Sequence, residues 1–284
     1  DNTSENILNY KGDQTLEGYV GGQTEVLDVP MGVTKIAMKE AAMDKTAASK
    51  ITAIKIPQSV DTIDAKSITA CLPALKDYEY ANAGDKNIKY LEYKIVDGIL
   101  YSADGKTLLS VPPGRKEVTI PDMVTTFAEG CFQGLSKDAV VTMESMRIPK
   151  VQGETGFKGT IQVPDSEGDA VRKGYYFAFG AESNQITFTT PKETYDPYVY
   201  VEENDILCDK DERSVLLGVN QKTAGVYRIP DAVTEIGAYA FAGCDKLTDV
   251  RVGRNVRRFA DNSLSIPGNI VRIELLGPGI EISG

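Results

Sequence analysis

Apolar residues in the C-terminal part of the chain recur at one interval of 23 residues. The pairs that share this interval are Val233/Val256, Ile236/Phe259, Phe241/Leu264, Leu247/Ile270, Val250/Ile273 and Val252/Leu275. Burying six such side chains contributes roughly 1.5–3 kcal/mol each, whereas ordering some two dozen residues costs about 1–2 kcal/mol per residue. One unit alone is therefore unstable, and the pattern predicts a solenoid whose stacked coils share a core.

Each unit contains two short extended runs joined by a tight turn. Residues 247–252 read L-x-x-V-x-V, which predicts a strand whose alternate side chains turn inward. Residues 233–236 read V-x-x-I and predict a second extended run on the opposite side, while the turn at 238–244 is expected to pack its apolar side chains inward. The whole pattern in residues 229–247 closely resembles the BspA-like leucine-rich repeats of surface and secreted proteins, most often from Bacteroidetes.

The resemblance covers residues 26–135 and 198–276. It implies a mainly β fold with short helical turns on one side, of the α+β class. The expected architecture is a right-handed, BspA-like leucine-rich-repeat solenoid with inserted β-hairpins.

Two earlier coils are expected, in residues 26–56 and 57–80. In the first coil, Val33 and Ile36 occupy the V-x-x-I positions, and the helix-compatible EAAMDKTAASK lengthens the turn before the next strand. In the second coil, Ile68 stands where the family pattern has phenylalanine. Such insertions fall in loops and leave the stack intact.

Two stretches, residues 93–114 and 198–219, interrupt the repeats with a hairpin signal. In the first, apolar runs flank the Ala-Asp-Gly turn at 103–105, where glycine tolerates a positive φ. The Ile-Leu pair at 99–100 matches the Ile-Leu pair at 206–207. A repeat opening follows each stretch, so we expect two hairpin-plus-repeat modules produced by internal duplication. BspA-like proteins commonly carry such a hairpin before a repeat.

We expect three segments along the chain. They are a polar lead-in at 1–25, a repeat array with a hairpin and a capping segment at 26–190, and a second hairpin-plus-repeat module at 191–284. The least regular stretch is 135–197. We interpret it as a cap on the first array followed by a linker, with continuous stacking through it as the alternative.

The composition removes several functional classes. The chain has 284 residues, with 31 Lys plus Arg against 41 Asp plus Glu, and the resulting charge of −10 disfavours nucleic acid and anionic membranes as partners. Histidine is absent, which excludes imidazole bases and the commonest zinc ligand. No Walker loop, dinucleotide fingerprint or calcium loop occurs. We therefore expect no catalytic residue, metal or cofactor, although a spatially paired carboxylate site stays open.

No apolar run reaches the ~20 residues that a membrane-spanning helix needs, so we expect no membrane insertion by this chain. The opening DNTSEN is typical of a mature or trimmed chain, and any signal or lipid anchor would lie outside it. The four cysteines, Cys71, Cys131, Cys208 and Cys244, show no C-x-x-C spacing. We interpret them as small buried apolar residues.

One row of outward residues is a candidate binding surface. Each member directly precedes the last apolar residue of its predicted strand. The row consists of Lys55, Glu79, Thr119, Arg228, Arg251 and Glu274. Outward positions on the strand side of a solenoid form a regular recognition face, but they are also the ordinary solvated rim.

Two further clusters have a functional and a structural interpretation. The arginines Arg251, Arg254, Arg257 and Arg258 could bind carboxylates, sulfated glycans or phosphate. We favour a solvated surface, because they leave their unit on opposite sides. An aromatic group could stack on sugar rings, but we favour a role in sealing the cap and the module junction. Its members are Tyr175, Tyr176, Phe177, Phe179, Tyr195, Tyr198 and Tyr200.

The family resemblance and the lack of a catalytic constellation together favour a non-enzymatic binding or adhesion protein. We expect it to be extracellular or at the cell surface, to bind a protein or glycan partner, and to be a monomer. Two alternatives stay open. The array could be a structural spacer of a surface protein, or an accessory module that binds carbohydrate.

Overall fold

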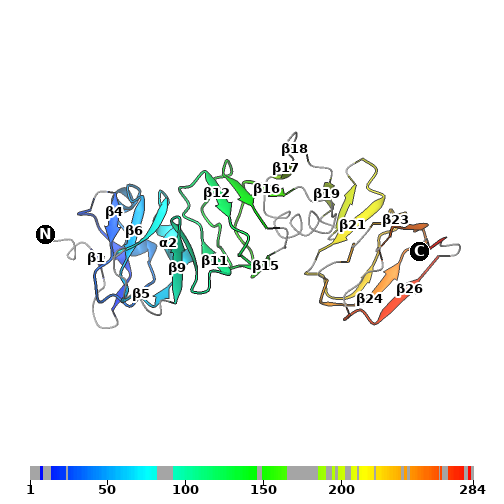
Figure 1. The fold of residues 1–284 in the computed structure, drawn as a ribbon, viewed down its shortest axis with the longest axis horizontal. Helices are drawn as coiled ribbons and strands as arrows, with labels where there is room; N and C mark the ends of the chain where they lie inside the picture. Colours follow the sequence, from blue (N-terminus) through cyan, green and yellow to red (C-terminus); the bar gives the residue numbers. More distant parts are fainter. Residues whose placement is uncertain are drawn as a thin grey trace. The chain divides into compact units, whose positions relative to one another are not determined.

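A computed structural model describes most of the chain as two compact units. The described residues are 7–8, 14–23, 25–81, 92–145, 149–164, 185–189, 194–195, 198–201, 206–209, 211–220, 222–237, 240–241, 244–261, 263, 268–277 and 281–282. The first unit comprises Asp1–Ser145, Pro149–Ile161 and Glu182–Asn184; the second comprises Met146–Ile148, Gln162–Ala181 and Gln185–Gly284. Within each unit, successive strands lie side by side as coils (Figure 1).

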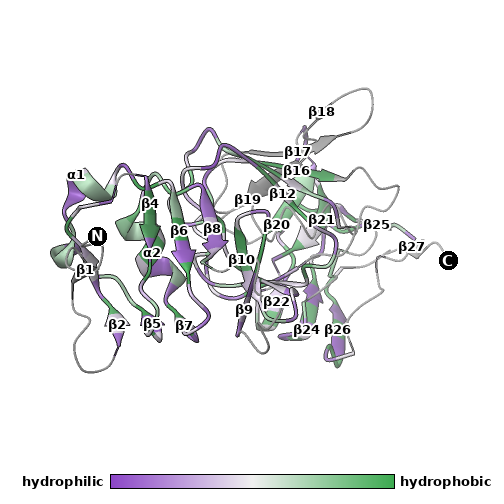
Figure 2. Cartoon of the chain, turned by 60° about the vertical axis from the view of Figure 1, so that its left-hand side comes forward, coloured by the Kyte–Doolittle hydropathy of each residue, from purple (hydrophilic) through white to green (hydrophobic). Residues whose placement is uncertain are grey.

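The first coils build two parallel sheets, one from each extended run. One sheet contains β4 (Val26–Asp28), β6 (Ala53–Ile56) and β8 (Asp77–Tyr80), and the other contains β2 (Thr15–Leu16), β5 (Lys35–Ile36) and β7 (Thr62–Ile63). Figure 2 shows both rows of strands. Leu27, Ile54 and Tyr78 are in register and at most 1% exposed, so they form one layer of the core. The prediction of two extended runs per coil is confirmed.

The stretch predicted as a lead-in contains part of this core. Leu16 on β2 and Tyr19 on β3 (Gly18–Tyr19) are fully buried, and β3 pairs with β1 (Ile7–Leu8) in antiparallel fashion. The Tyr19 hydroxyl donates to the Gln23 carbonyl at 2.8 Å, which closes the turn before β4.

Short helical segments connect the two sheets. They are η1 (Glu40–Ala42), α1 (Lys45–Ala48) and α2 (Ala65–Cys71). The Asp44 side chain accepts from two backbone N–H groups at the start of α1, and Asp64 accepts from the Ser67 N–H at the start of α2. Side-chain acceptors of this kind satisfy first-turn amides that lack helical partners. The expected helical turns are confirmed.

A three-stranded antiparallel insertion follows the second coil. Its strands are β9 (Tyr93–Val96), β10 (Ile99–Ser102) and β11 (Thr107–Ser110). The predicted turn at 103–105 joins β10 to β11 and is confirmed. A second turn, Asp97–Gly98, joins β9 to β10 with φ values of 49° and 73°. Positive φ at both positions is the signature of a type I′ turn, whose twist suits a two-residue hairpin.

The insertion is tied into the first coils by tyrosine contacts. The buried Tyr78 and Ser110 hydroxyls lie 2.7 Å apart, and the Tyr80 hydroxyl accepts from the Ile95 N–H at 2.7 Å. The Tyr80 and Tyr93 rings stack with their centroids 6.2 Å apart. Burial raises the pKa of both Tyr78 and Tyr93, so these phenols stay neutral over the physiological range.

Coils continue beyond the insertion in the first unit. Strands β12 (Glu117–Ile120) and β14 (Val140–Met143) are parallel neighbours, as are β13 (Thr126–Phe127) and β15 (Lys150–Val151), and β16 (Thr160–Pro164) comes next in sequence. The rings of Phe127, Phe132 and Phe157 meet edge to face at 5.4 and 5.3 Å. Strands β14 and β15 therefore extend the stack, which agrees, for this part of residues 135–197, with the alternative that the sequence left open.

The second unit repeats the same plan. Its insertion strands are β19 (Tyr198–Val201), β20 (Ile206–Asp209) and β21 (Val215–Val219), preceded by the antiparallel pair β17 (Gln185–Thr189) and β18 (Thr194–Tyr195). Parallel coils follow, with β23 (Glu235–Ile236), β25 (Arg258–Phe259) and β27 (Glu281–Ile282) in one sheet. The other sheet contains β22 (Gly225–Arg228), β24 (Leu247–Val252) and β26 (Arg272–Leu275).

The two insertions share an irregularity, which supports the predicted duplication. In the first, the register shifts between Leu100 and Tyr101 on β10. In the second, it shifts between Leu207 and Cys208 at the corresponding place on β20. A bulge is a specific feature that is maintained between related structures. Its recurrence at matched positions therefore agrees with the sequence match of the two modules.

The structure is a mainly β solenoid of stacked coils, as predicted. Val233, Phe241 and Leu247 are at most 2% exposed, and Val250 lies in register with Ile273 one interval later. The residues on either side of Val250 on β24 lie on the opposite, solvent-facing side of the strand. The 23-residue interval thus corresponds to one complete coil.

Replacement of an inward side chain should be far more damaging than replacement of an outward one. We expect Phe241→Ala to lower the free energy of unfolding by about 3–5 kcal/mol, because a large buried ring leaves a cavity. Arg251→Ala should change it by less than ~0.5 kcal/mol, because that side chain is exposed. Urea denaturation of both variants measures the difference. Equal effects would show that the inward position of Phe241 or the outward position of Arg251 is wrongly assigned.

All four cysteine side chains are buried, and none of them forms a disulfide. Burial raises the pKa of Cys208 to about 11, with Asp209 adding to the rise, and that of Cys244 to about 12, with Asp245 adding to the rise. Burial and the nearby Glu40 also raise the pKa of Cys71. The thiolate is the reactive form, so these side chains serve as small apolar core residues, as the sequence predicted.

The thiols should resist a disulfide reagent at pH 8 in the folded protein and react promptly after denaturation. The pKa of Cys208 and of Cys244 rises from the ordinary thiol value of 9.0 to about 11 and about 12 on folding. Protonated thiols therefore favour the folded state below pH 9, and this contribution is lost as the pH rises through the folded values. Colorimetric thiol titration measures the effect; rapid labelling of native protein at pH 8 would contradict the burial.

Candidate binding surface

The outward face of the sheet β22–β24–β26 carries two rows of mainly polar side chains. Side chains alternate along each strand, so Tyr227 and Val250 point into the core while their neighbours point out. Cross-strand register places Arg228, Arg251 and Glu274 in one row, and Val226, Asp249 and Arg272 in the next. The first of these rows consists of the three C-terminal members of the predicted row, which the structure therefore brings together. We name the six residues of both rows the charged ladder.

Ion pairs link neighbouring members of the charged ladder. Arg251 Nε lies 3.3 Å from a Glu274 carboxylate oxygen, and Arg272 Nε lies 3.7 Å from Asp249 Oδ1. Exposed pairs of this kind contribute about 0–1 kcal/mol, so a ligand can displace them at small cost. The face thus presents charged and hydrogen-bonding groups at the regular ~4.8 Å spacing of a sheet.

The first unit also carries rows of outward side chains that are in register across neighbouring strands. Lys55 lies in register between Asp28 and Glu79 across β4, β6 and β8. Thr119 lies beside Thr142 across β12 and β14. The residues that the sequence placed in one row thus fall on three separate sheets.

Several members of these rows were missed at the sequence level. They are Asp28, Thr142, Val226, Asp249 and Arg272. The repeat interval itself could have found most of them, because Thr142 follows Thr119 by 23 residues and Arg272 follows Asp249 by the same interval. Asp28 precedes Lys55 by 27 residues, since the first coil is longer.

A cleft opens where the insertion interrupts the strand row of the first unit. In the described sheets, β8 ends one sheet and β12 begins another. The cleft has a volume of about 470 Å³ and is lined by Lys76, Asp77, Gly114, Arg115, Lys116 and Glu117. Its wall mixes both signs of charge.

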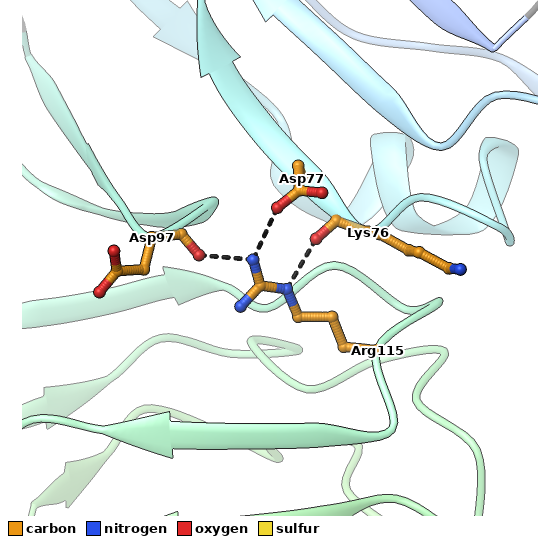
Figure 3. Close-up of polar contacts among 4 residues, drawn as sticks. All are labelled: Lys76, Asp77, Asp97 and Arg115. Atoms are coloured by element: carbon orange, nitrogen blue, oxygen red, sulfur yellow. Dashed lines mark hydrogen bonds and ion pairs between the residues drawn. The ribbon is translucent and has the colours of Figure 1, made fainter.

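The Arg115 guanidinium bonds to Lys76 and Asp77 at the start of β8 and to Asp97 in the β9–β10 turn (Figure 3). Its Nε donates to the Lys76 carbonyl at 2.6 Å, and its Nη2 donates to Asp77 Oδ1 at 2.8 Å and to the Asp97 carbonyl at 2.5 Å. Gly98 is required beside it, because a Cβ at that position would overlap both Asp77 Oδ1 and Arg115 Nη2. Arg115 therefore holds the β9–β10 turn against β8.

The arginine cluster does not form a single site. Arg251 lies on β24, whereas Arg258 lies on β25 in the other sheet, where it pairs with Glu235 at 2.7 Å. Arg257 donates to the carbonyls of Arg254 and Val256.

The aromatic group falls mostly on parts of the chain whose side chains the structure does not describe. Tyr175, Tyr176, Phe177 and Phe179 lie outside the described residues. Tyr195 lies on β18, and Tyr198 and Tyr200 lie on β19, but their side chains are not among the described ones.

Two features are absent from the described part of the chain, a cluster of metal ligands and a membrane-spanning helix. No cluster of three or more Cys, Asp or Glu side chains there could hold a metal ion. Within the same residues, no helix has both the length and the apolar character needed to cross a membrane.

One part of the chain matches a family model. Residues 223–282 match the model of the BspA type leucine-rich repeat region, with six copies. This segment of the chain carries BspA-type leucine-rich repeats. These residues include all the strands of the charged ladder, so the ladder is the strand-side face of a BspA-type array.

A search of solved structures finds weak matches to two leucine-rich repeat proteins and a vaccine antigen, among others. A leucine-rich repeat protein from Eubacterium ventriosum is 15% identical with a TM-score of 0.31, over 88% of this chain and 54% of that one. The pneumococcal vaccine antigen PcpA is 14% identical with a TM-score of 0.31, over 95% and 61%. A leucine-rich repeat protein from Bacteroides ovatus is 13% identical with a TM-score of 0.27, over 97% and 76%.

The chain thus spans between half and two thirds of the first two of these proteins. TM-scores this low do not establish a shared overall arrangement. No curated protein matches the sequence.

Removal of the Arg115 guanidinium should loosen the insertion from the preceding coil. We expect Arg115→Ala to cost about 1–3 kcal/mol, because two backbone carbonyls and a carboxylate lose their donor. Arg115→Lys should recover little, since an ammonium cannot reproduce the planar fork. Hydrogen exchange at the Tyr78 amide, which donates to the Gly98 carbonyl at 2.9 Å, should accelerate in both variants.

Lys116→Ala provides the matched control, because Lys116 lines the same cleft and is exposed. Its Tyr78 exchange rate should equal that of the unaltered protein. Equal exchange in all four proteins would mean that Arg115 does not hold the turn.

Proposed function

We propose that this chain is a non-enzymatic binding protein of the cell surface or extracellular space, which recognises a protein or glycan partner through the charged ladder. The observation that carries the proposal is the ladder itself. Six outward side chains from three parallel strands are held in two rows by the inward residues that alternate with them. A rigid scaffold with variable outward residues is the usual basis of recognition by repeat proteins.

The chemistry of the ladder suits an anionic or hydrogen-bonding ligand. Arg228 and Arg251 are adjacent in one row, and each pairs with an exposed carboxylate, at 3.4 and 3.3 Å. A guanidinium offers a planar fork of donors that matches carboxylate or sulfate groups in bidentate fashion. Uronic acids, sulfated sugars and acidic protein segments all present such groups. The proposed location rests on the BspA-type repeat, whose known members are surface and secreted proteins.

A binding screen with ladder variants tests the proposal. The purified chain is applied to immobilised glycans and extracellular-matrix proteins, and affinities for each hit are measured with Arg228→Glu and Arg251→Glu. We expect each charge reversal to weaken binding by about tenfold or more, as loss of an interface arginine typically does. Arg254→Glu is the matched control, since Arg254 is equally charged and exposed but lies off the sheet.

Three results would count against the proposal. Unchanged affinity in both ladder variants would place recognition elsewhere on the molecule. Hydrolysis of a ligand without stable binding would indicate an enzyme. Binding to none of the probes, with a shortened reach after deletion of the array from its parent surface protein, would indicate a spacer.

A further inference from the structure

The cleft between the starts of β8 and β12 has two similar sides that are joined through the backbone. Each side carries a lysine followed by an acidic residue, Lys76–Asp77 at β8 and Lys116–Glu117 at β12. The Gly114 N–H donates to the Leu75 carbonyl at 2.7 Å, and a Cβ at Gly114 would lie 2.6 Å from the Ala74 carbonyl oxygen. The two coils thus touch directly beside the cleft, which is therefore preformed.

Several polar groups that line the cleft are not used by the fold. Within the described residues, the ammonium groups of Lys76 and Lys116 form no ion pair, and the Glu117 carboxylate accepts no hydrogen bond. Arg115 makes its three bonds through Nε and Nη2, so that Nη1 has no partner among the residues that the structure describes (Figure 3). Both donors and acceptors therefore remain for a ligand.

The second module lacks these charged groups, although it has the same scaffold. The two repeat openings are related by an interval of 109 residues (230 − 121). At this interval Lys116 corresponds to Gly225, and Glu117 corresponds to Val226. A coil that follows an insertion therefore does not require a lysine or a glutamate at these positions, which favours a role in binding.

The charges of the cleft favour a ligand with one negative charge. Its cationic side chains are Lys76, Arg115 and Lys116. Its acidic residues are Asp77 and Glu117, so its net charge is +1 (3 − 2) in a chain whose net charge is −10. Arg115 and Asp77 are paired at 2.8 Å, which leaves two ammonium groups and one carboxylate for a ligand. A ligand carboxylate would accept charge-assisted hydrogen bonds from the ammonium groups.

The Glu117 carboxylate determines which anion fits best. Inorganic phosphate has the wrong charge for a second carboxylate nearby, and like charges placed together weaken binding. A free amino acid would bring its own ammonium group close to three cationic side chains. A sugar acid meets both demands, because its carboxylate accepts from Lys76 and Lys116 while its hydroxyl groups donate to Glu117. The volume of about 470 Å³ is in the range of small-molecule sites.

We propose that this cleft is a second binding site, which takes the carboxylate and hydroxyl groups of an acidic sugar, such as a uronic acid unit of a glycan. The cleft lies in the first unit and shares no residue with the charged ladder. The proposal therefore stands or falls separately from recognition by the ladder.

A nuclear magnetic resonance titration of the full chain with sodium galacturonate tests the site. We expect saturable shifts of the backbone amides of Gly114, Arg115 and Glu117. Acetate, inorganic phosphate, glycine and galactose should each bind about tenfold more weakly or worse, because each lacks a favourable contact or adds a repulsive one. Added salt should weaken galacturonate binding, since exposed charges are screened.

Three variants separate the two kinds of contact. Lys76→Gln and Lys116→Gln should each raise the dissociation constant of galacturonate about tenfold, because each removes a charged donor. Glu117→Gln should reduce the preference for galacturonate over acetate by a similar factor. The change affects the carboxylate of both ligands alike, but only the sugar loses a charged acceptor for its hydroxyl groups.

Control variants separate local binding from general charge effects. Lys106→Gln removes an exposed lysine next to β11, which lies on a different sheet from β12, and should leave the titration unchanged. Arg251→Glu alters the charged ladder and should also leave the shifts at Gly114 unchanged. Thermal melting should be the same in all these variants, because the replaced side chains are exposed.

Three results would overturn the proposal. One is the absence of saturable shifts at the cleft amides. Another is equal affinity for galacturonate and acetate, which would indicate only a general attraction of anions. A third is unchanged galacturonate binding in both lysine variants.

Discussion

The structure depends on one constraint, that no coil buries enough apolar surface to be stable alone. A coil here consists of two short strands, a turn and about six inward side chains, so its faces must be covered by neighbouring coils. Leu27, Ile54 and Tyr78 show the result in the first unit, where three successive coils contribute to one layer. Equivalent strands therefore pair in parallel and in register, because only an in-register pairing keeps the equivalent side chains of successive coils above one another.

The insertions satisfy this constraint in a different way. Strands β9–β11 and β19–β21 are antiparallel and add no strand to the sheets β4–β6–β8 and β22–β24–β26. On the opposite side of the coils, however, β11 and β21 continue the stack, because they pair in parallel with β13 and β23. The core is thus continuous on one side while the strand row is interrupted on the other. In the first unit Arg115 supplies the missing connection with three hydrogen bonds, where a strand would supply a ladder. The insertion therefore creates a cleft without opening the core.

The amino-acid sequence was sufficient for features that repeat. The 23-residue interval predicted which side chains of β24 turn inward, and the Ile-Leu match predicted the second insertion. It was insufficient for features that depend on contacts between unlike segments. Arg115 meets Asp77 across 38 residues and no periodicity marks it. The predicted binding row is divided for the same reason. The prediction assumed an unbroken row of strands, but the insertion breaks that row between Glu79 and Thr119.

Inward and outward positions of one strand are subject to separate demands, and β24 shows both. Its inward Val250 and Val252 are 1% exposed and pack against the neighbouring coils. Its outward Asp249 and Arg251 lie on the solvent side, in register with Arg272 and Glu274 on β26. Outward residues can therefore differ from coil to coil without a loss of core packing, which permits a charged ladder on a stable stack.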